Sequence, residues 1–149
     1  MLNIDEIDRN ILNEYLKDSR LSFREIAKRI DVAVGTVLSR TRKMEKDGLI
    51  KNYTVLLNYE KLGYPLTAIT EVTISKGKLV EVEKEISKLS PTCAVYDVTG
   101  FADVLIIGKF KNRKELSFFT KTLLALNYVE RTNTHLVLDT VKEDFRMIP

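Results

Sequence analysis

The spacing of apolar residues changes along the chain, and this change constrains the fold more than any other feature of the sequence. Through about the first fifty residues, apolar side chains recur at the three- and four-residue spacing of amphipathic helices. From Pro65 they begin to alternate with polar residues, as in a strand that is buried on one face. A chain of 149 residues can hold two small domains, so we expect a helical domain followed by a mixed one.

Three helices are predicted before residue 50. The first covers about residues 4–16. The second opens at Ser22, which forms a capping-box pattern with Glu25. The third ends near Gly48. Its predicted buried stripe consists of Val34, Val37, Thr41 and Met44.

The outer face of the third predicted helix is basic and polar. Helical geometry places eight residues on or beside this face: Gly35, Thr36, Leu38, Ser39, Arg40, Arg42, Lys43 and Lys46. One α-helix fits the major groove of DNA, where side chains near its N-terminus contact base edges and later Lys and Arg contact phosphates. We therefore predict that these residues bind double-stranded DNA.

The distribution of charge favours the same interpretation. Between Arg20 and Lys51 there are nine Lys or Arg and four Asp or Glu, an excess of five positive charges. The whole chain has an excess of only three, so the remainder is net negative. One region is therefore suited to a polyanion, although charge alone leaves an ordinary solvated helical face as the alternative.

Short motifs across nearly the whole chain resemble those of one known family. They are Glu25-Ile26-Ala27-Lys28-Arg29-Ile30, Thr36-Val37 with Arg40, Met44-Glu45, Gly48-Leu49-Ile50-Lys51-Asn52-Tyr53 and the connector Asn58-Tyr59-Glu60-Lys61-Leu62-Gly63. This set resembles the leucine-responsive/asparagine regulator (Lrp/AsnC) family of transcription regulators. Two positions depart from the family pattern. Ala33 stands where the family often has a capping Ser, a loss of about 1 kcal/mol, and Thr41 stands where the family often has Ile or Leu.

The C-terminal part has the predicted order β-α-β-β-α-β. Strands are expected over 66–74, 93–99, 103–110 and 128–139, with helices over 79–89 and from Asn112. This order is typical of a ferredoxin-like antiparallel sheet with two helices on one face. The predicted fold class is thus α+β: a helix-turn-helix (winged-helix-like) domain over 1–50 and a ferredoxin-like domain over 65–149.

A segment rich in β-formers, 51–64 with the preceding Leu49 and Ile50, connects the two predicted domains. We expect it to pack beside the helices or to pair with another subunit. One face of the predicted sheet has no helix to cover it, which favours a homodimer through the sheet. The resemblance implies the same dimer, and further association into octamers.

The resemblance also implies an effector site. Val98-Thr99-Gly100-Phe101-Ala102-Asp103 matches the family's glycine-x-x-aspartate loop, which binds a small amino-acid-like molecule between dimers. A backbone N–H at Gly100 would approach a carboxylate and Asp103 would pair with an α-ammonium. Thr132 and Thr134 would add hydroxyls. A plain hairpin turn, and packing between threonines of neighbouring strands, are the alternatives.

No catalytic motif accompanies these features, so an enzyme is not expected. The single cysteine and the single histidine, Cys93 and His135, cannot complete a structural zinc site, and no cofactor is predicted. His135 is expected at an interface or on the surface. The absence of a long apolar run or a signal-peptide pattern favours the cytoplasm over a membrane.

Taken with the resemblance, these features predict a sequence-specific DNA-binding transcription regulator. Its assembly or DNA binding is expected to respond to an amino-acid-like effector. The alternative is a metabolite-binding assembly protein that uses its helical domain for protein contacts. The two differ in their affinity for duplex DNA, which would be weak, sequence-blind and easily abolished by salt in the second case.

Overall fold

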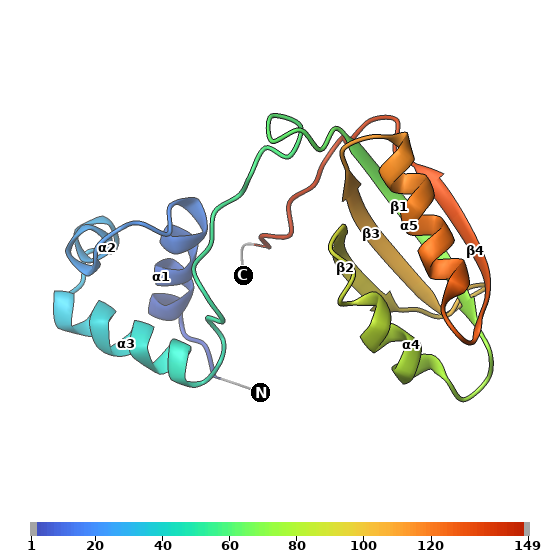
Figure 1. Ribbon diagram of the computed structural model, residues 1–149. Coiled ribbons are helices and arrows are strands. Elements are labelled where there is room, and N and C mark those ends of the chain that lie inside the picture. Colours follow the sequence, from blue (N-terminus) through green and yellow to red (C-terminus); the bar gives the residue numbers. More distant parts are fainter. Residues whose placement is uncertain (1–2, 148–149) are drawn as a thin grey trace. The chain divides into compact units, whose positions relative to one another are not determined.

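A computed structural model of the chain describes residues 3–147 (Figure 1). These residues form two compact units, one made of 3–56 together with 142–147 and the other of 57–141. The first unit contains three helices: α1 (Glu6–Lys17), α2 (Phe23–Ile30) and α3 (Val34–Lys46).

Local capping explains where the first two helices begin. At α1, the Asp5 carboxylate accepts from the backbone N–H of Asp8, and the Asp8 carboxylate accepts from that of Asp5. At α2, Ser22 and Glu25 form the reciprocal pair predicted from the sequence. Each box satisfies backbone donors that the first turn of a helix leaves without a partner.

The three helices enclose a small apolar core. Its buried members are Ile11, Ile26, Ala27, Val37 and Met44. The predicted stripe of α3 was wrong at one position, since Val34 is 42% exposed. Val34 is the first residue of the helix, where the chain has only just left the turn from α2 and no neighbouring helix covers it.

No strand forms between Gly48 and Pro65, although β-formers are frequent there. Leu49 and Ile50 pack against the helical core. The apolar residues Val55, Leu56 and Leu57 do not, and Val55 is 71% exposed. The predicted β character of this segment is therefore absent in a single chain, because a strand needs the backbone of a neighbouring strand as a hydrogen-bond partner.

The second unit is the predicted β-α-β-β-α-β domain. Its elements are β1 (Leu66–Ile74), α4 (Leu79–Ile86), β2 (Thr92–Asp97), β3 (Val104–Phe110), α5 (Arg113–Ala125) and β4 (Val129–Leu136). The strands form one antiparallel sheet in the order β2-β3-β1-β4. The α+β class and the ferredoxin-like order are confirmed, while α4 and β4 each end three residues before their predicted ends.

The core of this unit lies between the sheet and its helices. Alternate residues of β1 are buried, as in Ala68 and Val72, and Phe110 of β3 packs against Phe119 of α5 with ring centroids 5.1 Å apart. Figure 1 shows α5 lying along the sheet and α4 beside β2. Within residues 3–147, no helix is both long and apolar enough to cross a membrane.

Candidate DNA-binding helix and effector loop

The outer face of α3 carries exposed basic side chains. Of the predicted DNA-binding residues, Gly35, Ser39, Arg42, Lys43 and Lys46 are exposed, and Thr36, Leu38 and Arg40 are half-buried. None of Arg42, Lys43 or Lys46 forms an ion pair with another residue of the described chain. These three positive charges are therefore not neutralised by neighbouring carboxylates and are available to an anionic partner.

Arg40 has a structural role that sequence reasoning missed. Its Nη1 atom donates to Asp5 Oδ2 at 2.6 Å and lies 3.3 Å from Asp8 Oδ2, so it ties α3 to the start of α1. The backbone N–H of Asp8, and then Arg40, hold the pKa of Asp5 below its ordinary value. Asp8 is only 6% exposed, and an unpaired carboxylate there would be costly.

A second ion cluster joins α1 to α2. Glu14 accepts from Lys17 at 2.7 Å and from Arg29 at 2.9 Å through its two carboxylate oxygens. The hydrogen bonds from Lys17 and then Arg29 hold the pKa of Glu14 below its usual value of 4.5. Together with the Arg40 pairs, this cluster links α1 to both α2 and α3.

Two features weaken α3 locally. Ala33 precedes the helix in an extended conformation and, as expected from its side chain, makes no capping hydrogen bond. The hydroxyl of Thr41 is fully buried and has no hydrogen-bond partner. These are the two positions at which the sequence departs from the pattern it resembles.

The segment after α3 is held by a tyrosine. The Tyr53 hydroxyl donates to Glu45 at 2.9 Å, and its ring meets the edge of Tyr15 with centroids 5.4 Å apart. Burial, and then the hydrogen bond to Glu45, raise the pKa of Tyr53. Tyr53 therefore packs within the helical unit.

The predicted effector loop lies between β2 and β3. Gly100 adopts φ +131°, a conformation that L side chains rarely take, and Phe101 beside it is fully exposed. The N–H of Asp103 donates to Val72 O, and Asp103 Oδ2 accepts from the backbone N–H of Ile74 at 2.7 Å. The carboxylate thus continues the β1–β3 ladder one step beyond the last paired residues, Val72 and Val104.

Thr132 and Thr134 lie on β4, on the other side of β1 from the loop. Thr132 pairs with Val72, and Val72 O accepts from the N–H of Asp103. Thr132 and Asp103 therefore lie on opposite sides of β1 at the level of Val72. Two strand spacings put them roughly 10 Å apart. The Thr134 hydroxyl is 3.1 Å from that of the buried Thr70, the packing that sequence reasoning held as an alternative.

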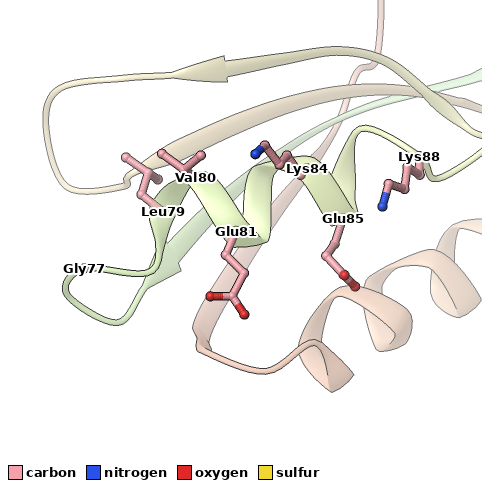
Figure 2. A pocket seen from close by; sticks show the side chains of 7 residues that line it. All are labelled: Gly77, Leu79, Val80, Glu81, Lys84, Glu85 and Lys88. Atoms are coloured by element: carbon pink, nitrogen blue, oxygen red, sulfur yellow. The ribbon is translucent and has the colours of Figure 1, made fainter.

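The surface hollow drawn in Figure 2 lies elsewhere, along α4. Its lining residues are Gly77, Leu79, Val80, Glu81, Lys84, Glu85 and Lys88. None of the predicted effector residues lines it. In the figure the carboxylates of Glu81 and Glu85 point to one side of the helix, and the Lys84 side chain points away from them.

A polar cluster on the sheet face away from the helices was not anticipated. Asn133 Nδ2 donates to Glu71 Oε2 at 3.0 Å and lies 3.0 Å from His135 Nε2. His135 is exposed on β4, as a surface or interface residue would be. The alternation of side chains along β1 and β4 could have placed these residues on one face of the sheet. It could not have shown that they are neighbours, because that depends on the register between the two strands.

Two family models match the chain. A winged helix-turn-helix DNA-binding model matches residues 4–51, and an Lrp/AsnC ligand-binding domain model matches residues 67–147.

Similar proteins agree with these matches. An uncharacterised HTH-type transcriptional regulator from Pyrococcus abyssi is 49% identical over 98% of this chain and 99% of its own. The leucine-responsive regulatory protein of Klebsiella pneumoniae is 34% identical over 98% of this chain and 92% of its own. A transcriptional regulator from Neisseria meningitidis, solved as a complex with L-Met, is 25% identical with a TM-score of 0.90, covering 97% of this chain and 96% of that one.

A helix-turn-helix unit followed by a ligand-binding unit defines a class of DNA-binding transcription regulator, and proteins of this class are not enzymes. Within that class, the chain belongs to the Lrp/AsnC family.

Proposed function

We propose that this protein binds specific DNA sequences through α3 and that an amino-acid-like effector modulates its assembly or its DNA binding. In this proposal residues 1–50 bind DNA, 51–64 connect the domains, and 65–149 bind the effector and assemble the subunits. The observation that carries it is the unpaired, exposed row formed by Arg42, Lys43 and Lys46 on a helix-turn-helix.

The eight residues of α3 divide by position along the helix. Gly35, Thr36 and Ser39 lie in its first half, where a short side chain or a bare backbone lets the helix approach base edges. Arg42 follows one turn after Leu38 and is long enough to reach a base or a phosphate. Lys43 and Lys46 belong to the last turn and are suited to phosphates. Arg40 contributes by fixing α3 against α1.

Two single substitutions test the DNA contact. The duplex is selected from a random pool with the wild-type protein, and affinity is then measured by fluorescence anisotropy over a range of salt concentrations. Lys46→Ala should weaken binding to all sequences alike and reduce the salt slope by about one. Arg42→Ala should weaken binding and, if Arg42 reads a base, relax the preference at one position of the site.

Lys88→Ala, just after α4, is the matched control, because it removes an exposed lysine outside the helical unit. Unchanged binding by both α3 variants would refute the assignment of α3. A wild-type protein that binds duplex weakly and without sequence preference, yet retains a protein partner at the same salt, would favour an assembly protein instead.

The loop between β2 and β3 supports a site for a ligand with two charged ends, such as a free amino acid. One oxygen of Asp103 accepts from Ile74, which leaves the other for an α-ammonium group, and in this proposal the backbone at Gly100 binds the carboxylate. Thr132 and Thr134 add hydroxyls on the far side of β1. The Phe101 side chain is fully exposed in a single protomer. Its exposure supports a site that a second copy completes, in a homodimer or in a higher assembly such as an octamer.

The pocket is tested with a pair of variants at one position. Asp103→Asn keeps an oxygen that can accept from Ile74 and removes the negative charge, whereas Asp103→Ala removes both. Isothermal titration against each of the twenty amino acids should give a ligand for wild type and at least a tenfold weaker affinity for Asp103→Asn, with an unchanged thermal midpoint. If Asp103→Asn binds the ligand as wild type does, the charge is not part of the site.

A further inference from the structure

The exposed face of α5 has a charge pattern that the proposed function does not use. Lys114 and Lys121 are both exposed, and neither forms an ion pair with any residue in the described part of the chain. They are seven residues apart, so they lie on one side of the helix and about 10 Å from each other along its axis. Arg113, also exposed, begins the same helix.

The only acidic residue of α5, Glu115, offsets one of these charges, so Lys111, Arg113, Lys114 and Lys121 keep an excess of three positive charges. Glu115 is half-buried, and its Oε2 atom accepts from the backbone N–H of Lys111 at 2.6 Å. The Lys111 ammonium lies 5.2 Å from the centre of the Tyr64 ring. A neutral aromatic ring does not cancel the positive charge of an ammonium group. Lys111, which follows β3, and Arg113, Lys114 and Lys121 of α5 are all exposed, and these four residues are called the basic surface of α5 below.

The second helix of the same layer lacks this property. Over residues 78–88, which contain α4, three lysines are matched by three glutamates: Lys78, Lys84 and Lys88, and Glu81, Glu83 and Glu85. Lys78 and Glu81 form an ion pair, and Figure 2 shows Glu81, Lys84, Glu85 and Lys88 around the hollow. This segment therefore has no net charge to attract an approaching polyanion. The two helices have equivalent roles in packing against the sheet, so packing does not account for the difference in charge.

Packing does not require the basic residues of α5 either. The helix is held by Phe119 and Leu123, which are buried in the core of the unit. Lys114 and Lys121 are on the opposite side, next to Phe118, which is 71% exposed. Substitutions at these two lysines should therefore leave the fold intact.

We infer that the basic surface of α5 is a second, sequence-independent contact for duplex DNA, used by the DNA that flanks the operator. Along the roughly 10 Å between Lys114 and Lys121, a duplex presents about six phosphate charges. This inference rests on the proposed DNA binding by α3. Once α3 holds an operator, the flanking duplex is present at a high effective concentration, so a weak charge contact is sufficient.

The test compares two duplexes and two double variants. One duplex holds only the operator selected with wild-type protein, and the other adds about 40 mixed-sequence base pairs on each side. Lys114→Ala/Lys121→Ala, the α5 variant, removes the proposed contact. Lys84→Ala/Lys88→Ala, the α4 variant, removes the same charge from α4 and the residues just after it. Affinity is measured between 50 and 200 mM salt.

The α5 variant should bind the short duplex as wild type does and lose the extra affinity of the long one. For the long duplex its salt slope should fall by about two, so the change in affinity across this salt range shrinks roughly tenfold. The α4 variant should match wild type on both duplexes.

Several outcomes overturn the inference while leaving α3 as the operator contact. They are a long duplex that gives wild type no extra affinity, an α5 variant with the wild-type slope, and an α4 variant that loses as much as the α5 variant. If the α5 variant keeps the wild-type salt slope for DNA but no longer binds a protein that wild type binds, the α5 surface would instead be assigned to a protein partner. Failure of wild type to prefer any duplex would refute the proposed function itself.

Discussion

At the scale of single residues, Thr41 is the clearest source of lost stability in the helical unit. Its hydroxyl is buried and has no hydrogen-bond partner among residues 3–147. Thr41→Val keeps the shape of the side chain and removes the unsatisfied group, so the free energy of unfolding should rise by about 1 kcal/mol.

Urea denaturation followed by circular dichroism measures this change. Thr120→Val is the control, because the Thr120 hydroxyl donates to Leu116 O at 3.1 Å and its removal should bring no gain. A loss of stability in Thr41→Val would mean that the hydroxyl has a partner in solution.

Glu14 should make the helical unit sensitive to acid. The pKa of its carboxyl is lowered in the folded chain by Lys17 and then Arg29, so these contacts favour folding while Glu14 is ionised. Their contribution is complete above the usual value of 4.5 and is lost as the pH falls through the lowered folded value.

Thermal midpoints between pH 7 and pH 3 check this sign. The midpoint of wild type should exceed that of Glu14→Gln near neutrality, and the difference should shrink at acid pH. A difference that stays constant over the whole range would show that the charge of Glu14 is not involved.

At the scale of elements, the start of α3 can be improved. Ala33 already has the extended backbone of a capping residue but no side-chain acceptor. Ala33→Ser supplies an acceptor for the N–H groups of the first turn and should stabilise the helical unit by about 0.5–1 kcal/mol. The midpoint of urea unfolding measures the gain, and Ala33→Val, which cannot accept a hydrogen bond, should show none.

The elements were largely predictable, because each depends on a local pattern. The period-two alternation of β1 and the capping pair at Ser22 were visible in sequence and are present in the structure. The contacts of Arg40 were not, because Asp5 is 35 positions away and only the packing of α3 on α1 brings them together. The strand that was expected near Val55 is absent for a different reason. Its residues favour a strand locally, but no neighbouring strand within one chain pairs with them.

The candidate site was predictable in part. Arg42 and Lys46 were assigned to the outer face of α3 from helical spacing alone, and they are exposed there. Spacing does not reveal that Asp103 is bonded to the backbone of Ile74, because that contact depends on the register of β1 and β3. The roles of all these residues in binding stay predictions.

At the scale of the whole molecule, the sheet face without helices should form the contact between protomers. Ile69 and Ile107 are paired on this face and only half-buried in one chain. Ile107→Glu would place a charge in the proposed interface and should shift the assembly toward monomer, as measured by size-exclusion chromatography with light scattering.

Phe118→Glu is the control for this prediction, since it places the same charge on the exposed side of α5, away from the sheet. Equal dissociation by both variants, or by neither, would remove the sheet face from the assembly.

The bond between Asp103 and Ile74 has a consequence for genetics. With Asp103 in the proposed effector site, a screen for strains that no longer respond to the effector should find two phenotypes among substitutions at this one codon. Replacement by a residue that can still accept a hydrogen bond would give a regulator that accumulates normally and ignores its signal. Replacement by an apolar residue would also loosen the end of a central strand, and the strain would resemble a deletion at elevated temperature.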